Sequence, residues 1–375
     1  MPAVSAADPA LEALFLPVLE GDIAWPAAGG ALFLGARAGR PLHARPLPGL
    51  VCEQAWKPAV DALHRDGFDA GADVAVPAAR YPLVLLLPPR QREHARARFA
   101  QALQRLAPGG TLVACMPNKE GARTGEADLA RLAGPLRSQS KHHCRVFWTA
   151  PLDGPADPVL AAEWRDLDAP RRIVDAVAAG GRDLEGHASD AVVPGGSFLS
   201  RPGVFAWDRV DAASRLLAAH LPTDLHGAVA DLGAGWGYLA MQVLARCPAV
   251  ASLDLYEADA RALELARANL AGMQASTPAA SRASLAFHWH DVAAGLGQRR
   301  YDAIVCNPPF HAQGAGERVD LGRAFIAAAA GAMKPGGRLW LVANRHLPYE
   351  AALAGRYARV REVASRDGFK VIEAA

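Results

Sequence analysis

"AVADLGAGWGYLA", residues 228–240, decides the fold of this chain. Small and apolar residues lead to Asp231, and glycines follow at Gly233, Gly235 and Gly237 before a new apolar stretch begins. Glycines between a strand and a helix allow a tight turn, a close approach of the backbone to a ligand, and close packing of the helix. The segment therefore predicts the first strand and helix of an open α/β sheet, with a ligand site where the strand ends.

Around this segment, the second half of the chain alternates strand-like and helix-like stretches. Such alternation predicts a parallel sheet with helical crossovers. Asp367-Gly368 predicts a tight turn between two final strands within residues 358–374. The expected strands cover 228–232, 252–256, 285–289, 302–306 and 337–343, and the expected helices cover 208–220, 237–246, 258–270 and 318–333.

Three segments of the first half resemble three segments of the second half in the same order, which indicates a duplicated fold. The aligned pairs are "ALFLGARAG" (31–39) over 229–237, "YPLVLLLPPR" (81–90) over "YDAIVCNPPF" (301–310), and, with a slip of one residue, "LAPGGTLVACMPN" (106–118) over "MKPGGRLWLVAN" (333–344). Gly35 and Gly39 then lie on Gly233 and Gly237.

The first copy lacks the residues that carry chemistry in the second. Phe33 replaces Asp231, Arg37 replaces Gly235, Leu87 replaces Asn307 and Arg90 replaces Phe310. An arginine side chain would fill the space that a glycine leaves open for a ligand. We therefore expect a degenerate domain over 1–160, a linker region over 161–195 with a short helix near 171–179, and a catalytic domain over 196–375.

An acidic residue supports a nucleoside ligand at the glycine turn. Glu257 ends the next expected strand, 20 positions after Gly237, the spacing at which a carboxylate can accept both ribose hydroxyls. A dinucleotide site would place its third glycine one residue later, so that a helix N-terminus faces a diphosphate. Asp231 would repel phosphate and attract an ammonium or sulfonium group. The pattern thus favours S-adenosylmethionine over NAD.

The fourth expected strand runs into Asn307, Pro308, Pro309 and Phe310. A planar amine is a weak nucleophile, and two fixed acceptors for its N–H groups would aim the nitrogen at a methyl group. The Asn307 side-chain oxygen and the Pro308 carbonyl can be those acceptors, while the prolines hold the backbone rigid. Phe310 can stack on a flat base. The segment predicts a device that presents an amine for in-line transfer.

After the third expected strand, Asp291 is placed to accept a bond from an adenine amino group. His288 and His290 lie on one face of that strand, but two histidines without a third ligand do not make a metal site, and we expect none. The composition, with 51% hydrophobic and 21% charged residues, is that of a globular protein.

Five scattered cysteines without a C-x-x-C pair, no apolar run of membrane-spanning length and no basic signal-peptide region predict a cytoplasmic protein. A formal net charge of +2 gives no global signal for a polyanion partner, so any surface that binds nucleic acid must be local.

Four motifs resemble those of class I S-adenosylmethionine-dependent methyltransferases. They are Asp-Leu-Gly-Ala-Gly-Trp-Gly, Tyr-Glu-Ala-Asp-Ala, Asn-Pro-Pro-Phe-His and Val-Ala-Asn-Arg-His-Leu-Pro-Tyr. Together with "RPGVFAWDRVDAASRLL" (201–217) and "GFKVIEA", they resemble the bacterial ribosomal RNA guanine-N2 methyltransferases of the small-subunit methyltransferase C type. The resemblance covers nearly all of 196–375 and, more loosely, 80–150; residues 161–200 are longer than is usual in that family.

This resemblance implies two tandem Rossmann-like methyltransferase domains, each a mostly parallel sheet flanked by helices, the N-terminal one degenerate. It implies methyl transfer from S-adenosylmethionine to N2 of a guanine in 16S ribosomal RNA. The residues implied to hold the cofactor are Asp231, Gly233, Ala234, Gly235, Gly237, Glu257, Asp291 and Phe205. Those implied to hold the guanine are Asn307, Pro308, Pro309 and Phe310.

A guanine in folded RNA must be unstacked to enter such a site, and local positive charge can anchor the RNA backbone. We expect the first domain to supply this docking through two basic runs. The candidates are Arg90, Arg92, Arg96 and Arg98, and Arg137, Lys141, His142, His143 and Arg145. Solvated helix faces also explain such runs.

Other functions stay open on sequence grounds. They are methylation of guanine-N2 in the large subunit, of adenine, of protein glutamine N5 or of a small molecule, and a silent RNA-binding assembly factor. A monomer is compatible with the sequence, which does not set the oligomeric state.

Overall fold

The computed structural model describes residues 8–72, 79–177, 193–276, 282–309 and 315–375. The chain forms two compact units, Met1–Ala169 and Pro170–Ala375. The boundary between them falls within residues 161–195, and each unit is described here by itself.

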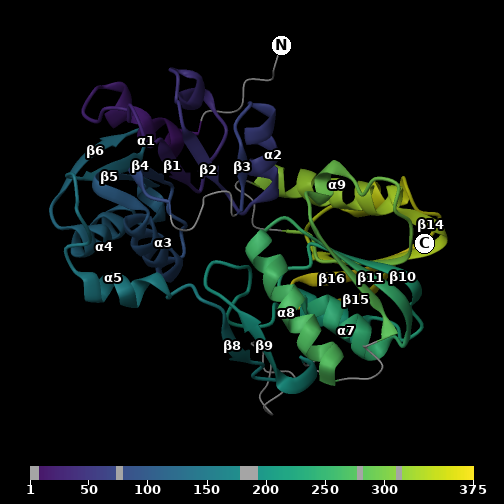
Figure 1. Cartoon of the computed structure of the whole chain (residues 1–375). Coiled ribbons are helices and arrows are strands. Elements are labelled where there is room, and N and C mark those ends of the chain that lie inside the picture. The colour runs from purple at the N-terminus through teal and green to yellow at the C-terminus, as the bar shows by residue number, and fades with distance from the viewer. Residues whose placement is uncertain (1–7, 73–78, 178–192, 277–281, 310–314) are drawn as a thin grey trace. The chain divides into compact units, whose positions relative to one another are not determined.

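Unit 1 is a seven-stranded sheet with the strand order β3-β2-β1-β4-β5-β7-β6 (Figure 1). β7 runs antiparallel to β5 and β6, while the other pairings are parallel. Its strands are β1 (Ala31–Leu34), β2 (Leu50–Glu53), β3 (Ala70–Gly71), β4 (Tyr81–Leu86), β5 (Leu106–Pro117), β6 (Leu136–Lys141) and β7 (Cys144–Thr149), and its helices are α1 (Pro9–Leu19), α2 (Lys57–Arg65), α3 (Arg92–Gln104), α4 (Ala122–Ala133) and α5 (Pro158–Arg165).

Unit 2 contains a second seven-stranded sheet, with the order β12-β11-β10-β13-β14-β16-β15, and a separate pair, β8-β9. The strands are β8 (Arg171–Val174), β9 (Ser197–Ser200), β10 (His226–Leu232), β11 (Ala249–Glu257), β12 (Ser284–Trp289), β13 (Tyr301–Cys306), β14 (Met333–Asn344), β15 (Val360–Arg366) and β16 (Phe369–Ala374). The helices are α6 (Ala212–His220), α7 (Tyr238–Arg246), α8 (Ala260–Ser276), α9 (Ala315–Gly331) and α10 (Glu350–Ala354), with a short 3-10 turn η5 (Val292–Ala294).

The two large sheets have the same topology, and even an irregularity is repeated. Tyr81 pairs with Leu106, after which the register shifts between β4 and β5. Tyr301 pairs with Met333, and the same shift follows between β13 and β14. β5 and β14 also share one pattern of burial along their length. The duplication expected from sequence is therefore present strand by strand, and the fold is a tandem of two Rossmann-like domains.

One local expectation is wrong. Residues 171–174 form strand β8 rather than the start of a short helix, and Arg171 pairs with Ser200 of β9 in an antiparallel register. The partner lies far along the chain, and Ile173 and Val174 are β-branched, so strand pairing outweighs the local helical pattern. The turn at Asp367 and Gly368 is confirmed: both have positive φ, 54° and 79°, as the tight hairpin between β15 and β16 requires.

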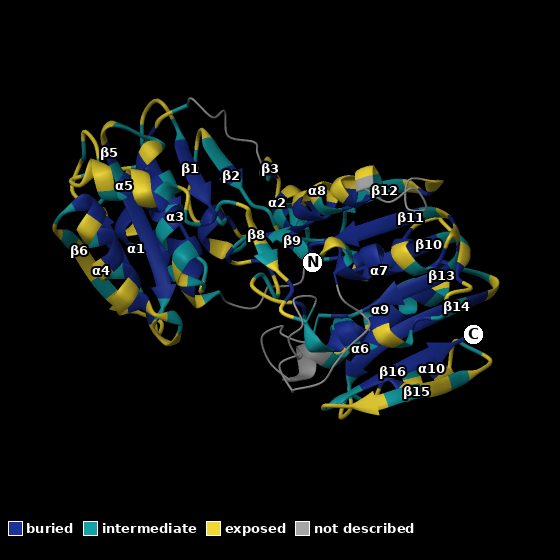
Figure 2. Ribbon diagram, turned by 90° about the horizontal axis from the view of Figure 1, so that it is seen from below, coloured by how far each residue is buried: buried dark blue, intermediate teal, exposed yellow. Residues whose placement is uncertain are grey.

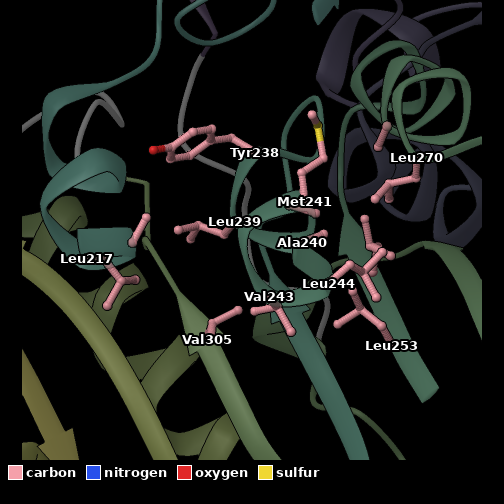
Figure 3. Close-up of a cluster of buried hydrophobic side chains, with 14 of the residues drawn as sticks. Leu217, Tyr238, Leu239, Ala240, Met241, Val243, Leu244, Leu253, Leu270 and Val305 are labelled. Atoms are coloured by element: carbon pink, nitrogen blue, oxygen red, sulfur yellow. The ribbon is translucent and has the colours of Figure 1, made fainter. Parts of the chain in front are cut away.

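The core of unit 2 lies on both faces of its sheet, as expected for parallel strands covered by helices (Figure 2). Val229 and Val305 point to the face covered by α6, α7 and α8, whereas Ala230 and Ile304 point to the face covered by α9. Figure 3 shows Leu217 of α6 with side chains of α7 and Val305 of β13 in one cluster. This packing fixes the carboxyl ends of β10 and β13, where the site lies.

Candidate functional site

The glycine turn after β10 has one open position and one closely packed position. A Cβ placed on Gly235 (φ +55°) would meet no atom of the described residues within 4 Å, so the backbone there borders space that these residues leave open. A Cβ placed on Gly237 (φ +95°) would lie 3.3 Å from Ala266 of α8. The backbone N–H groups of Gly233 and Ala234 donate to the Tyr256 carbonyl at 2.9 and 3.0 Å. The turn is thus fastened to β11 and leaves room for a ligand beside Gly235.

Glu257 closes the turn from the end of β11. Its Oε2 accepts the N–H of Gly235 at 2.8 Å, and its Oε1 accepts the N–H of Asp259 at 2.8 Å. Burial raises the pKa of this carboxyl to about 7, although both backbone bonds oppose the rise. Each oxygen retains a second lone pair, so the carboxylate can still accept bonds from two hydroxyls of a ligand.

Asp231 is fully buried at the end of β10. Its Oδ2 accepts the N–H of Ala240 in α7 at 3.0 Å, while its buried Oδ1 has no hydrogen-bond partner among the described residues. Burial raises the pKa of Asp231 to about 7, and the nearby Glu257 adds to the rise. A buried carboxylate oxygen without a donor suits a cationic ligand, because the positive charge would stabilise the ionised form.

A segment that precedes the sheet is fastened beside the glycine turn. Phe198 of β9 stacks on Trp236, with ring centroids 3.8 Å apart and an angle of 6° between the planes. Asn269 of α8 accepts the N–H of Leu199 at 2.7 Å and donates to the carbonyls of Leu199 and Trp236. Phe205, farther along this segment, is 50% exposed. The sequence analysis singled out neither Asn269 nor Trp236. The position of Trp236 between two glycines was a signal that could have identified it.

Asp291 is the second residue after β12, next to the end of β11. Its Oδ1 accepts the N–H of Ala293 at 2.9 Å and thereby caps the short turn η5. The N–H of His290 donates to the Glu257 carbonyl at 2.9 Å, which ties the ends of β11 and β12 together. Asp291 therefore shares a sheet edge with Glu257, as its proposed role at the adenine requires.

His288 and His290 already have protein contacts. The His288 ring stacks on Tyr256 at 4.5 Å, its Nε2 lies 3.5 Å from Asp254 Oδ2, and burial lowers its pKa. His290 Nε2 lies 2.7 Å from the Gly295 carbonyl oxygen. Among the described residues, no group of three or more His, Cys, Asp or Glu side chains is placed to hold a metal ion.

Asn307 follows β13, beside the glycine turn: a Cβ on Gly233 would lie 3.8 Å from the Asn307 carbonyl oxygen. Its side-chain nitrogen donates to Asp211 Oδ2 at 3.0 Å and to Ser214 Oγ at 2.7 Å. Its Oδ1 is buried and has no donor among the described residues. The amide therefore has a bound donor end and a vacant acceptor end.

Pro308 is buried and Pro309 is half-buried, directly after Asn307. Phe310 lies outside the described residues, so its expected stacking role stays a prediction. Sequence reasoning missed Asp211 and Ser214; the signal was an N-cap pattern, Asp-Ala-Ala-Ser, at the start of an expected helix.

The corresponding edge of unit 1 is occupied by its own side chains. Gly35 and Ala36 donate to the Glu53 carbonyl, as Gly233 and Ala234 donate to Tyr256, so Gln54 corresponds to Glu257. Gln54 donates to the Ala36 carbonyl at 2.8 Å and accepts the N–H of Trp56 at 2.9 Å. Arg37, at the position of Gly235, donates to Asp8 Oδ2 at 3.0 Å. This unit has replaced the acid and the open glycine of the ligand site.

Most arginines of the two basic runs are bound within unit 1. Arg92 and Arg96 both make paired hydrogen bonds with Asp128, which is 3% exposed. The other ion pairs join Arg90 with Glu120, Arg98 with Glu53, Arg137 with Asp22, His142 with Glu12 and Arg145 with Glu126. Lys141 and His143 are exposed at the turn between β6 and β7. Arg90, Arg92 and Arg137 remain more than half exposed despite their ion pairs, so the role of the runs in docking RNA stays a prediction.

No helix in the described part of the chain is long and apolar enough to cross a membrane. Residues 195–373 match a family model described as "Methyltransferase small domain".

Three known proteins show the range of similarity. "Ribosomal RNA small subunit methyltransferase C" of Pseudomonas aeruginosa (strain LESB58) is 30% identical over 304 residues, 80% of this chain and 81% of that protein. "Ribosomal RNA large subunit methyltransferase G" of Alcanivorax borkumensis is 42% identical over 172 residues, 45% of this chain and 42% of that protein. The structure of a T. thermophilus 16S rRNA guanine N2 methyltransferase, in complex with S-adenosylmethionine and guanosine, matches with a TM-score of 0.75 and 25% identity over 100% of this chain and 93% of that one.

Proposed function

The chain belongs to the ribosomal RNA small subunit methyltransferase C family, and from this premise we propose that it transfers a methyl group from S-adenosylmethionine to the exocyclic N2 of a guanine in 16S ribosomal RNA. The observation that carries the chemistry is the buried Oδ1 of Asn307 beside the glycine turn, which has no donor among the described residues. This oxygen can accept a hydrogen bond from an N–H group of a ligand, and the exocyclic amine of guanine is such a donor.

The residues at the carboxyl ends of β10, β11 and β12 fit S-adenosylmethionine. That group supplies, when bound, a methyl on a positively charged sulfur. Asp231 offers its vacant oxygen to a cationic part of the ligand, and Glu257 offers both oxygens to the ribose hydroxyls. The space at Gly235 would admit a ligand against the backbone, and Asp291, near Glu257 at the same sheet edge, would accept a bond from the adenine amino group.

The substrate side needs orientation rather than a strong base. Asn307 Oδ1 accepts one N–H of the amine and the Pro308 carbonyl accepts the other, which aims the nitrogen lone pair along the line of transfer. The nitrogen becomes acidic as it is alkylated, so its proton can leave to water or to a neighbouring acceptor. Phe310 is proposed to stack on the guanine.

A second candidate substrate is guanine in large-subunit RNA, because the large-subunit relative from Alcanivorax is 42% identical over 172 residues. That match covers less than half of either protein, whereas the small-subunit relatives match across about four fifths of this chain. Family membership places the chain among enzymes, against the alternative of a silent assembly factor.

We further propose that unit 1 docks RNA, through side chains that have no structural task. Lys119, Arg123 and Lys141 are exposed, and none of them makes an ion pair with any residue that the structure describes. Lys119 and Arg123 follow β5 and Lys141 ends β6, and Pro117 pairs with Cys144, so all three lie at the same sheet edge. We propose that the active enzyme is a cytoplasmic monomer. It would act on the small subunit or on an intermediate of its assembly.

Transfer of labelled methyl from S-adenosylmethionine to small subunits, large subunits and naked ribosomal RNA tests the function. We expect N2-methylguanine in small-subunit RNA, and a loss of about 100-fold or more with Asn307→Ala. Label on large-subunit RNA alone would favour the second candidate. Cofactor binding without label on any RNA would overturn guanine as the substrate.

A further inference from the structure

Two residues of the segment 201–217, Asp211 and Ser214, contact the Asn307 amide and determine how it is oriented. The carboxylate of Asp211 offers only acceptor oxygens, so only the NH₂ end of the Asn307 amide can face it favourably. Ser214 Oγ lies 2.7 Å from the same nitrogen and takes the second N–H. Both N–H groups of the amide are therefore in use, and the amide oxygen has no partner among the described residues.

The alternative orientation of this amide would disable the site. Rotation by 180° would present an NH₂ group to an incoming amine, so donor would face donor. It would also turn the amide oxygen towards the Asp211 carboxylate, where two acceptors repel. Asp211 and Ser214 thus hold the Asn307 amide in the one orientation in which its oxygen faces the incoming amine as an acceptor.

We propose that Asp211 and Ser214 are positioning residues for methyl transfer, which lock Asn307 with its oxygen towards the target amine; this rests on the proposed function. They act through Asn307 and touch neither the methyl donor nor the reacting nitrogen. The same lock makes the site selective for a donor group, because a target that offers an acceptor would meet the lone pairs of Oδ1.

The platform that carries both residues is rigid. Asp211 is the N-cap of α6 and accepts the N–H of Ser214 at 2.8 Å with the same Oδ2 that binds Asn307. The next residue, Arg215, forms a buried ion pair with Asp175 at 2.7 Å, and Asp175 Oδ2 also accepts the N–H of Val193. The start of α6 therefore has little freedom to withdraw from Asn307.

Ser214→Ala is the cleanest test, because it removes the hydroxyl while the backbone N–H that caps α6 remains. We expect kcat to fall about 5- to 10-fold, as for the loss of one hydrogen bond, with the Kd for S-adenosylmethionine within about 2-fold of wild type. Asp211→Ala should lower kcat by about 10- to 100-fold. Asp211→Asn should recover most of the activity, since its amide oxygen can still cap α6 and accept from Asn307.

The loss of a helix cap needs a matched control, and unit 1 provides it. Asp8 caps α1 by accepting the N–H groups of Ala10 and Leu11, and α1 packs on β5 and β7 as α6 packs on β14 and β16. Asp8→Ala should reduce stability to a similar extent as Asp211→Ala, but leave kcat within about 2-fold.

The decisive measurement is the same substitution in an Asn307→Ala background. If Ser214 acts through Asn307, Ser214→Ala should cause no further loss there, as expected for residues that work as one unit. An equal loss in both backgrounds, or full activity of Ser214→Ala in the otherwise wild-type enzyme, would overturn the inference and leave the proposed function intact. A wild-type enzyme that methylates no guanine would instead overturn the proposed function, and this inference with it.

Discussion

Asp8 and Asp211 cap equivalent helices in the two units, but their carboxylates hold different side chains. Asp8 binds Arg37, whose position corresponds to Gly235 of unit 2, whereas Asp211 binds Asn307. Asp8 therefore holds an arginine at the ligand edge of unit 1, whereas Asp211 holds the Asn307 amide that we propose to present the substrate amine. Arg37 thus gives Asp8 a charged partner at the position where unit 2 has Gly235, which leaves Asp211 without a corresponding arginine there.

One cofactor per chain is the first prediction, because Gln54 stands in unit 1 where Glu257 stands in unit 2. Titration calorimetry should give a stoichiometry of about one S-adenosylmethionine per chain. Glu257→Gln should weaken binding by about 10- to 100-fold, since a charged hydrogen-bond acceptor for the ribose is lost. Gln54→Ala is the matched control and should leave the affinity unchanged. Two binding events in the wild-type protein would contradict the assignment of unit 1 as silent.

Substitutions at two glycines of the turn should affect the stability of the chain and its affinity for S-adenosylmethionine to different extents. Gly237→Ala forces a side chain against Ala266 at positive φ, and we expect a loss of about 2 kcal/mol in the free energy of unfolding. Gly235→Ala meets no neighbour in the described part of the chain, so it should cost about 1 kcal/mol from its backbone conformation alone. Its methyl group would enter the open space, and affinity for S-adenosylmethionine should fall by about 10-fold or more. Urea denaturation measures the stability of both variants, and calorimetry measures their affinity for S-adenosylmethionine. A wild-type affinity in Gly235→Ala would refute the ligand role of Gly235.

Asp231 should make both stability and cofactor affinity depend on pH. Its pKa in the folded, cofactor-free chain is raised to about 7 by burial, above the ordinary value of 3.8. The folded state thus binds the proton more tightly than the unfolded state, and this contribution to stability is fully present below about pH 4 and is lost as the pH rises through about 7. Relative to Asp231→Asn, the wild type should be less stable at about pH 8 than at about pH 5.

A cationic ligand would favour the ionised carboxylate, so its affinity should rise over the same range and binding should release protons near neutral pH. Calorimetry in two buffers with different ionisation enthalpies measures that release. A pH-independent difference between wild type and Asp231→Asn would show that another group is responsible.

The parts of the site that sequence predicted are those encoded within one short segment or by a fixed spacing. Gly235 and Glu257 are joined by a 2.8 Å hydrogen bond because the turn and the end of the next strand meet at one sheet edge, which parallel topology guarantees. Asp211 and Ser214 lie 96 and 93 positions from Asn307, and no local pattern indicates that contact.

The same reasoning explains the error at β8, whose strand conformation depends on β9 more than on its own residues. The hairpin at Asp367-Gly368 was predictable because its two residues impose the positive φ angles themselves.

The basic residues of unit 1 provide the last prediction. Arg96 binds Asp128, which is 3% exposed, and its guanidinium lies 4.5 Å from the Trp164 ring. Arg96→Glu would place a second carboxylate beside a buried one, and the free energy of unfolding should fall by about 3 kcal/mol. A loss of RNA binding in that variant would therefore report damage to the fold.

Lys119→Glu, Arg123→Glu and Lys141→Glu disturb no ion pair among the described residues and should leave the unfolding transition unchanged. If unit 1 docks RNA, each should weaken RNA binding and reduce the slope of log affinity against log salt by about 1, while the Kd for S-adenosylmethionine stays at the wild-type value. Filter binding at several salt concentrations measures that slope. Unchanged RNA affinity in the variant with all three charge reversals would contradict RNA docking by this surface of unit 1. The role of unit 1 would then be to stabilise the chain.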